Sequence, residues 1–409
     1  MNNLKIRIMK KQILLNLILI SNLVYAQCDG RYQDEIFSDI SKTTVEYTDV
    51  YDWSSSDSGL DMDIYQAEGD TAINRPLIVF AHGGVYVAGN KDNQAMISLC
   101  EAFAKRGYVT ASIQYRLTSL INLSLPNASE ILTQTVVNSI SDMKAAIRFF
   151  RKDFSENGNT YGINPEQIFV GGYSAGAVTA VHLSAVDSDD IPDDLQEFFD
   201  NAGGIEGNSG NEGYSSDVIG AISLAGAIQS LAFFDADDEP IVSLHSTDDN
   251  TVSYECDNAL GNDAFPILCG SGEIHSTLET LGVQNDLYTF NSGGHAIPIT
   301  GISETAAPFI SDFLYNIICE TVSVNDISVS TKTNIYPNPA SETLNIDNHM
   351  GGDKILIFDN FGRKVMESEI RGLHSKILVS NLNDGLYHLQ IFNHLGLLSN
   401  KRFVKTNFN

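Results

Sequence analysis

The chain is 409 residues long, with 43% hydrophobic and 19% charged residues, and its 52 acidic and 24 basic side chains leave a formal net charge of −28. This length suits two domains, and the hydrophobic content excludes an intrinsically disordered chain. The negative charge argues against polyanionic partners, so we expect neither nucleic acid nor an anionic membrane surface as a ligand.

Residues 1–26 have the pattern of a secretory signal peptide. Four basic residues precede an apolar run at residues 13–20, and the small residue Ala26 stands at the expected cleavage position. The apolar core is much shorter than the roughly 20 residues that a membrane-spanning helix needs. Cys28 follows closely, but Gln27 occupies the position where a lipoprotein signal has a small residue. We therefore expect an exported chain without stable membrane insertion, secreted or held at the cell surface.

All five cysteines follow the predicted cleavage site, and an exported chain meets an oxidising compartment in which disulfides persist. Cys256 and Cys269 could close a short loop, and Cys28 and Cys319 could tie together the ends of one long segment. Cys100 lies in a helical pattern, where a buried thiol is expected.

From residue 60 to residue 319, apolar runs rich in β-branched residues alternate with helical patterns. The apolar runs predict strands at residues 76–82, 109–115, 167–171, 218–224, 240–245 and 286–290. The helical patterns predict helices at residues 95–106, 134–153, 175–185, 274–281 and 305–319. Two earlier stretches, residues 44–51 and 60–67, are expected to be antiparallel edge strands. The alternation predicts an α/β fold with a mostly parallel sheet between helices.

The tail of the chain has a different composition. Residues 334–409 hold 7 acidic and 8 basic residues, whereas residues 27–333 hold 45 acidic and 12 basic ones. Residues 321–333 are short and polar without a helical period, which is typical of a linker. Short apolar runs separated by turns predict a small all-β sandwich in the tail. The expected domains are a signal peptide at 1–26, an α/β domain at 27–320, the linker at 321–333, and the sandwich at 334–409.

Residues 172–176, Gly-Tyr-Ser-Ala-Gly, fit the pattern Gly-x-Ser-x-Gly between a predicted strand and a predicted helix. The two glycines permit a sharp turn that exposes the Ser174 hydroxyl above the sheet. The N-terminus of the helix below favours negative charge nearby. We therefore expect Ser174 to be a catalytic nucleophile.

A nucleophilic serine that transfers acyl groups needs fixed donors for the oxyanion of its tetrahedral intermediate. His82-Gly-Gly84 follows the first predicted parallel strand, so the N–H groups of Gly83 and Gly84 can face the site. The N–H group of Ala175, directly after the nucleophile, is the third expected donor. We expect His82 to brace this loop rather than to act as a base.

The general base should be a histidine, whose ordinary pKa lies near neutrality. Four of the nine histidines lie in the tail. His295 follows the last predicted strand in a glycine-containing loop, as expected of a base that reaches over a strand end. His182 and His275 lie on predicted helices and His245 in a predicted strand, so His295 is the expected base.

The acid that orients His295 should lie between Ser174 and His295 if the chain order is Ser, Asp, His. The loop after the strand at residues 240–245 offers Asp248 and Asp249. Two adjacent carboxylates cannot both face the histidine. We favour Asp249, with Asp248 as the alternative.

The α/β domain, from about residue 45 to residue 319, resembles an α/β-hydrolase of the esterase/lipase kind. The resemblance rests on five runs that occur in the family's order, at residues 82–84, 106–117, 172–176, 247–252 and 293–295. It implies a serine esterase fold and supports Asp249 as the triad acid, because the run Thr-x-Asp places the acid there. Val85 and Tyr173 differ from the residues usual in the hormone-sensitive-lipase and cholinesterase subgroups, so the substrates of those subgroups are not implied.

The tail resembles the C-terminal sorting domain of the type IX (Por) secretion system of Bacteroidetes. The resemblance rests on Asn-Ile-Tyr-Pro-Asn-Pro-Ala at residues 334–340, on residues 382–391 and on Lys-Arg-Phe-Val-Lys at residues 401–405. It implies handling by the type IX machinery, passage across the outer membrane and removal of the tail. A carbohydrate-binding module is the alternative for a sandwich in this place.

Together these patterns predict a secreted serine hydrolase that cleaves carboxylic esters, small or polymeric, with Ser174, His295 and Asp249 as its triad and without a cofactor or metal. A secreted serine peptidase of the same fold and a catalytically inactive surface-binding protein are the alternatives. Residues 118–133 and 188–216 interrupt the strand and helix rhythm near the site. The second stretch is either a solvated loop or a wall of the acyl or sugar site, and its acidic residues offer a low-specificity place for Ca²⁺.

Overall fold

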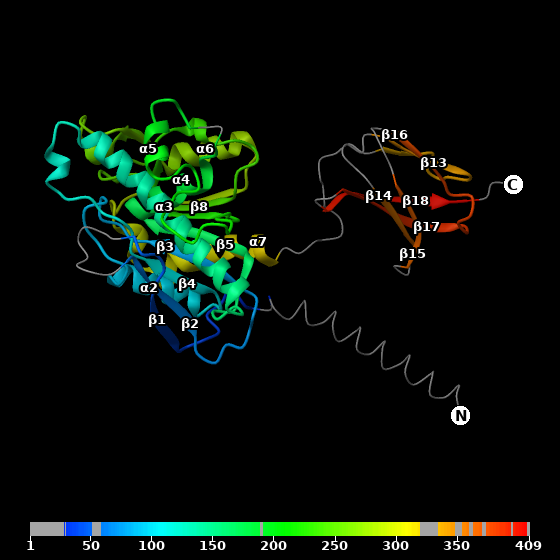
Figure 1. Ribbon diagram of the computed structural model, residues 1–409, viewed down its shortest axis with the longest axis horizontal. Coiled ribbons are helices and arrows are strands. Elements are labelled where there is room, and N and C mark those ends of the chain that lie inside the picture. The colour runs from blue at the N-terminus through cyan, green and yellow to red at the C-terminus, as the bar shows by residue number, and fades with distance from the viewer. Residues whose placement is uncertain are drawn as a thin grey trace. The chain divides into compact units, whose positions relative to one another are not determined.

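A computed structural model describes residues 28, 30–50, 59–188, 191–319, 334–347, 354–359, 363–369, 374–393 and 396–406. The predicted signal peptide and linker lie outside these residues. The chain folds as two compact units, Met1–Cys319 and Glu320–Asn409, which we describe separately (Figure 1).

An eight-stranded sheet runs through the first unit in the order β1-β2-β4-β3-β5-β6-β8-β11. Its strands are β1 (Ile40–Glu46), β2 (Asp61–Ala67), β3 (Arg75–Ala81), β4 (Val109–Ile113), β5 (Ile163–Tyr173), β6 (Ala221–Leu224), β8 (Ile241–Ser246) and β11 (Asn285–Phe290). β2 pairs antiparallel with β1 and β4, and the other pairs are parallel. The predicted α/β fold and its antiparallel edge are confirmed, although the edge strand begins earlier than expected, at Ile40.

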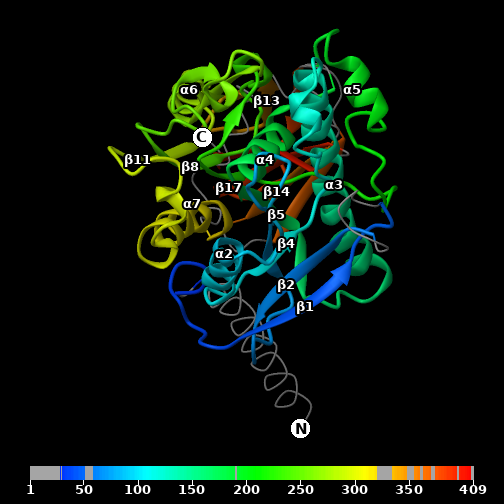
Figure 2. The same cartoon turned by 90° about the vertical axis from the view of Figure 1, so that its left-hand side faces the viewer.

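Helices cover both faces of this sheet (Figure 2). α3 (Ala128–Glu156) and α4 (Ala175–Ala185) pack on one face, and α2 (Gln94–Ala104) and α7 (Ala307–Cys319) on the other. β3 is buried along its whole length because its alternate side chains enter the two cores, Leu77 and Val79 on the α3 side and Ile78 and Phe80 on the α2 side. A strand buried on both faces reads as a continuous apolar run.

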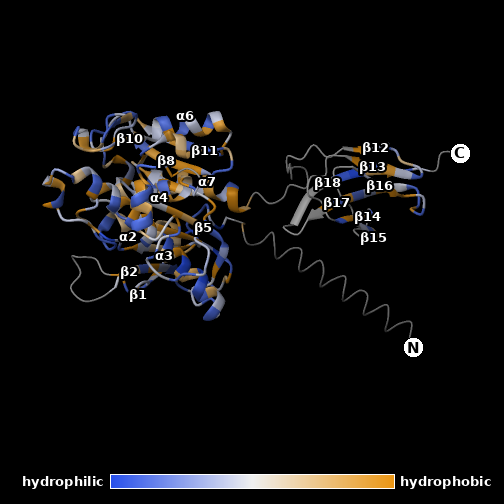
Figure 3. Cartoon of the chain, turned by 45° about the horizontal axis from the view of Figure 1, so that its top comes forward, coloured by the Kyte–Doolittle hydropathy of each residue, from blue (hydrophilic) through white to orange (hydrophobic). Residues whose placement is uncertain are grey.

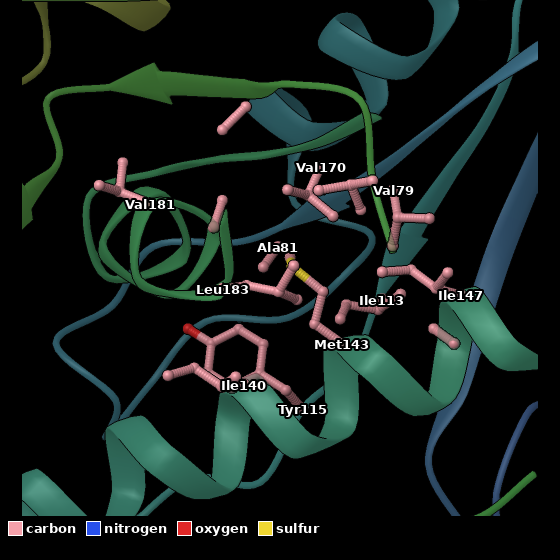
Figure 4. Packing of buried hydrophobic residues seen from close by; sticks show 14 of the residues in the cluster. Val79, Ala81, Ile113, Tyr115, Ile140, Met143, Ile147, Val170, Val181 and Leu183 are labelled. Atoms are coloured by element: carbon pink, nitrogen blue, oxygen red, sulfur yellow. The ribbon is translucent and has the colours of Figure 1, made fainter. Parts of the chain in front are cut away.

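Local signals explain where several helices begin and end. Asn93 caps the N-terminus of α2, and its side chain accepts hydrogen bonds from the N–H groups of Ala95 and Met96. α6 (Ser271–Leu281) ends at Gly282, which adopts the left-handed conformation that glycine tolerates. α3 turns Ile140, Met143 and Ile147 toward the sheet (Figure 4), at the three- and four-residue spacing of a helix that buries one face.

A small second sheet and a short helix were not predicted. β7 (Ala227–Ile228), β10 (Ile267–Gly270) and β9 (Cys256–Asn258) form a three-stranded antiparallel sheet. α5 (Gln196–Asn201) lies in the stretch at residues 188–216. Both anticipated disulfides are present, Cys256–Cys269 across β9 and β10 and Cys28–Cys319 at the end of α7, and Cys100 is a buried free thiol as expected.

The second unit contains a three-stranded sheet, β12-β13-β16, and a four-stranded sheet, β15-β14-β17-β18. The strands are β12 (Asn334–Tyr336), β13 (Thr343–Asp347), β14 (Lys354–Asp359), β15 (Lys364–Glu369), β16 (His374–Leu378), β17 (Gly385–Asn393) and β18 (Gly396–Lys405). Alternate residues such as Ile355 and Ile357 enter one shared core. The predicted all-β tail is confirmed, with β12 and β15 as additional strands.

Hydropathy follows this architecture. Apolar residues lie along β5 and β8 in the middle of the first unit, and polar residues lie on its outer loops (Figure 3). The catalytic candidates follow β3, β5, β8 and β11, where the parallel strands end. Because parallel strands all end at the same edge of the sheet, side chains far apart in the sequence meet there.

Candidate active site

Ser174 lies at the tight turn between β5 and α4. Its backbone has φ 55° and ψ −121°, an unfavourable conformation for a residue with a side chain. The turn has no room for larger residues on either side, since a Cβ on Gly172 would lie 2.3 Å from the Gly176 carbonyl carbon and one on Gly176 would lie 2.0 Å from the Ala81 carbonyl oxygen. The Ser174 N–H donates to the Leu224 carbonyl at 2.8 Å, which ties the turn to β6.

Three of the predicted residues come together above this turn. Ser174 Oγ lies 2.8 Å from His295 Nε2, and His295 Nδ1 lies 2.7 Å from Asp249 Oδ2. These contacts assign the hydrogens, because only an Nδ1–H can donate to the carboxylate and Nε2 is then left to accept from the serine hydroxyl. The arrangement can remove a proton from the serine oxygen as that oxygen attacks a carbonyl carbon.

Asp249 is buried, and both oxygens of its carboxylate accept hydrogen bonds. Its Oδ1 accepts from the N–H groups of Thr251 at 2.8 Å and Val252 at 3.0 Å. Burial alone would raise the pKa of Asp249, but the hydrogen bonds from His245 and His295 hold it well below its ordinary value. The carboxylate therefore stays ionised beside the His295 imidazole.

His245 is a site residue that the sequence patterns missed. Its Nε2 lies 3.2 Å from Asp249 Oδ2 and 3.0 Å from the Val252 carbonyl, while its Nδ1 lies 2.9 Å from Ser271 Oγ. Two acceptors around Nε2 require that nitrogen to carry the hydrogen, so His245 is a second imidazole donor to the Asp249 carboxylate. The sequence feature that could have identified His245 is its position four residues before Asp249, near the end of a strand.

Asp248 has a separate part in the site. Its carboxylate accepts from the N–H groups of Gly293 at 3.2 Å and Gly294 at 2.8 Å, and from Ser246 Oγ at 2.6 Å. The Ser246 hydroxyl, followed by the two glycine N–H groups, lowers the pKa of Asp248 below its ordinary value. Asp248 therefore anchors the loop that carries His295, and Asp249 is the residue that contacts the imidazole.

The two glycines of the expected oxyanion site approach the serine closely. A Cβ on Gly83 would lie 3.1 Å from the Ser174 Cβ and 2.9 Å from the Tyr173 ring, so only glycine fits there. Gly84 has φ +133°, and its Cβ would lie 1.9 Å from the Ala88 carbonyl oxygen. Neither N–H group donates to another part of the described chain, and the N–H of Ala175 is at the first position of α4, where helical N–H groups have no partner within the helix.

Aromatic side chains hold the glycine loop in place. The His82 ring is fully buried and stacks on Tyr115 with the ring centres 4.4 Å apart, and the Tyr115 hydroxyl donates to the His82 carbonyl at 2.7 Å. The Tyr86 hydroxyl donates to the Ala175 carbonyl at 2.7 Å. His82 braces the loop, as its sequence context predicted.

The remaining histidines of the first unit do not contact the triad serine. Burial lowers the pKa of both His182 and His275 to about 4, so both rings are neutral near pH 7. His182 accepts from the Gln229 N–H through Nε2 at 3.1 Å, and His275 lies 2.8 Å from the Asn285 side chain. Both are packed residues, as their predicted helices suggested.

An apolar pocket opens beside Ser174. Its walls come from the glycine loop, α3, α4, the segment around α5, and the disulfide-closed segment that holds β9 and β10. Leu195 and Phe199 belong to the stretch at residues 188–216, so part of this stretch lines the pocket. The glycine-rich part packs on α3 instead, where Arg116 and Ser209 share the buried carboxylate of Asp142.

Within the described ranges, no cluster of three or more histidine, cysteine, aspartate or glutamate side chains is placed to hold a metal ion. No helix in the same ranges has the length and apolar character that a membrane span requires.

Two family models match the chain. Residues 62–209 match the BD-FAE family, and residues 334–406 match the secretion system C-terminal sorting domain. The first match contains Ser174, Gly83 and Gly84. The second match contains strands β12 to β18 of the second unit.

Two curated proteins are similar to part of the chain. The chain is 28% identical over 109 residues to Gut esterase 1 of Caenorhabditis elegans and 29% identical over 110 residues to Gut esterase 1 of Caenorhabditis briggsae. Each match covers 27% of this chain but only 18% of the relative, so the chain spans less than a fifth of the length of these curated relatives.

One solved structure shares the fold, and a second has a similar alignment score. A truncated carbohydrate esterase from gut microbiota aligns with a TM-score of 0.50 at 20% identity, over 69% of this chain and 97% of the other. The propionate-bound esterase Est2 of the Planctomycetes species Thermogutta terrifontis has a TM-score of 0.49 at 22% identity, over 68% of this chain and 94% of the other. The order of strands and the helices on both faces are those of an α/β-hydrolase.

Proposed function

We propose that this chain, an α/β-hydrolase with an esterase-family domain and a secretion-system C-terminal sorting domain, hydrolyses carboxylic esters through an acyl-enzyme on Ser174. The observation that carries the proposal is the continuous contact from Ser174 Oγ through His295 to the buried Asp249, with distances of 2.8 and 2.7 Å. A strained serine between a strand and a helix, paired with a base and an oriented acid, is suited to acyl transfer.

In the first half of the reaction, Ser174 Oγ attacks the ester carbonyl carbon while His295 Nε2 takes the hydroxyl proton. The carbonyl oxygen becomes an oxyanion and is bound by the N–H groups of Gly83, Gly84 and Ala175. The tetrahedral intermediate then collapses. The bond to the alcohol breaks, and the imidazolium of His295 gives its proton to the departing oxygen.

In the second half, water attacks the acyl-enzyme. His295 Nε2 takes a proton from the water, and a second oxyanion forms in the same place. When this intermediate collapses, Ser174 recovers its proton and the carboxylic acid leaves. Throughout the cycle Asp249 keeps its charge, because its hydrogen bonds hold the proton affinity of the carboxylate low.

The C-terminal sorting domain indicates export by the type IX system to the cell surface or exterior. We extend this to removal of the tail during export, which would leave the α/β-hydrolase unit as the mature enzyme. An exported esterase meets small or polymeric esters outside the cell.

The test is the hydrolysis of p-nitrophenyl acetate and butyrate by the purified protein and by Ser174→Ala. We expect turnover by the parent protein and a loss of about 10⁶-fold in kcat for the variant. Ser276→Ala is the matched control, because Ser276 is exposed on α6. Mass spectrometry of the quenched reaction should detect an acyl group on the peptide that contains Ser174.

If the folded parent protein does not turn over any ester, the proposal is wrong. Cleavage of peptide substrates in the same assays would then identify a peptidase. A protein that binds esters or peptides without cleaving them would be a binding protein with a hydrolase fold.

A further inference from the structure

The pocket beside Ser174 has one long wall formed by α3. Leu132, Val136 and Ile140 lie on successive turns of this helix and all line the pocket. Eight residues of helix separate the first from the last, which corresponds to roughly 12 Å at 1.5 Å per residue. This wall is much longer than an acetyl group.

The other walls are also apolar. Leu195 and Phe199 come from the segment around α5, Phe233 from the residues after β7, and Leu268 from β10. Among the described residues that line the pocket, there is no carboxylate, ammonium or guanidinium group. An acyl group that enters the pocket therefore leaves water for hydrocarbon surroundings, which favours an uncharged aliphatic chain.

Two polar side chains on the wall, those of Tyr86 and His182, are already engaged within the protein. The Tyr86 hydroxyl donates to the Ala175 carbonyl at 2.7 Å. His182 is neutral, with its Nδ1 2.8 Å from a backbone carbonyl of α4 and its Nε2 3.1 Å from the Gln229 N–H. An acyl group that carries a hydroxyl would find few open partners and would lose the hydrogen bonds that it makes to water.

The position of His295 shows which part of an ester faces the pocket. His295 must give its proton to the departing alcohol, so the alcohol lies on the His295 side of the tetrahedral carbon. His295 is not part of the pocket wall, and its side chain is 18% exposed. With the oxyanion directed to Gly83 and Gly84, the remaining substituent, the acyl chain, points into the pocket, and the alcohol points toward solvent.

We propose that this pocket is an acyl-binding site that selects unbranched aliphatic acyl chains of roughly four to eight carbons, a length that fits the wall of α3, and that the site accepts alcohols of varied structure. The inference rests on the proposed ester hydrolysis at Ser174. Each methylene that enters the pocket should raise kcat/KM about fourfold until the chain fills it.

The experiment compares two sets of esters with the purified protein. The first set has p-nitrophenol as the alcohol and acyl chains from acetyl to decanoyl, together with a feruloyl ester. The second set has a butanoyl group on different alcohols, including a sugar. We expect kcat/KM to rise at least tenfold from acetyl to hexanoyl and to fall by decanoyl, with the feruloyl ester below hexanoyl and less than tenfold variation among the alcohols.

Val136→Phe tests the wall directly, because Val136 lines the pocket without taking part in the triad. We expect it to lower kcat/KM for hexanoyl esters at least tenfold more than it lowers kcat/KM for acetyl esters. Leu268→Phe, on β10, repeats the test from another wall if Val136→Phe does not fold. Ser155→Phe places the same side chain on an exposed position of the same helix and should leave the profile unchanged.

Activity that depends on Ser174 but is highest for acetyl or feruloyl esters would overturn the acyl-site inference and leave the esterase proposal intact. An unchanged chain-length profile in both Val136→Phe and Leu268→Phe would also overturn it. Activity that is absent for all esters, or that survives in Ser174→Ala, would instead refute the proposed function.

Discussion

At the scale of single residues, the carboxylate of Asp249 joins two imidazoles. Oδ2 lies 2.7 Å from His295 Nδ1 and 3.2 Å from His245 Nε2, and Oδ1 accepts from two backbone N–H groups. A buried charge is tolerated only when its hydrogen-bonding capacity is used in this way. The adjacent carboxylate of Asp248 accepts hydrogen bonds from the loop that carries His295.

Asparagine substitutions should separate these two carboxylates. We expect Asp249→Asn to lower kcat by about 10³- to 10⁴-fold, because an amide does not stabilise the imidazolium and can favour the wrong tautomer of His295. Asp248→Asn keeps an acceptor for the glycine N–H groups and should cost about tenfold or less. Steady-state kinetics on a p-nitrophenyl ester gives both values, and a larger loss for Asp248→Asn would contradict the assignment.

His245→Phe tests whether the second imidazole that contacts Asp249 affects activity. Phenylalanine removes the donor to Asp249, and we expect the pH at which kcat/KM is half-maximal on the acidic side to move, with kcat about tenfold lower. The control is His275→Phe, which removes a buried histidine that does not contact the triad. If the two variants lose stability equally and only His245→Phe changes the pH profile, the effect is on the site. An unchanged profile in both would show that His245 only fills space.

At the scale of elements, short segments outside the main sheet form part of the pocket beside Ser174. β7, β9 and β10 are two to four residues long, and the disulfide Cys256–Cys269 closes the chain between the last two. This segment supplies Leu260, Pro266 and Leu268 to the pocket. Such short strands lack the hydrophobic repeat that identifies longer ones.

Replacing the pair Cys256 and Cys269 by serine should weaken this wall. In the chain-entropy account, a loop of this length contributes about 3 kcal/mol to stability. We expect a lower unfolding temperature together with a selective loss of activity on longer acyl esters. The comparison variant replaces Cys28 and Cys319 by serine. It opens a much larger loop, whose closure contributes about 6 kcal/mol in the same account, and it should lower stability without changing the chain-length profile.

At the scale of the whole molecule, negative charge is concentrated in one part of the chain. Residues 27–333 hold 45 of the 52 acidic residues, whereas residues 334–409 are nearly balanced. Some of these carboxylates are partly buried together. Burial, with the nearby charges of Asp187, Asp217 and Asp235, raises the pKa of Glu239 to about 7.

This raised pKa makes stability depend on pH. The folded protein holds the Glu239 proton more tightly than the unfolded chain, whose glutamates titrate near pH 4.5, so the free energy of unfolding falls as the pH rises from about 4.5 to about 7. Glu239→Gln should remove this loss. After allowance for solvent screening, we expect it to stabilise the protein by about 1 kcal/mol at pH 8 and to have no effect at pH 4.

Thermal unfolding at the two pH values measures the difference. Glu197→Gln is the matched control, since it removes the same charge from an exposed position on α5. A gain at pH 8 that is equal in the two variants would mean that general charge repulsion, and not the burial of Glu239, is responsible.

The amino-acid sequence was sufficient to predict the order of the long strands and helices, because apolar periodicity over many residues reports which faces are buried. It also determined the candidates Ser174 and His295, because a serine between glycines at a strand-to-helix turn and a histidine after the last strand have local signatures. The family resemblance supported the choice of Asp249 over Asp248, and it identified the tail as a sorting domain, which the match to the sorting-domain family confirms.

The contacts among these residues follow from the tertiary fold and could not be predicted from local patterns. The contact of His245 with Asp249 depends on how the chain turns after β8, and the pocket depends on side chains contributed by α3, α5 and β10, which are far apart in the sequence. Local patterns report which side of an element is buried. They do not report which other element covers it, because that is set by packing between distant segments.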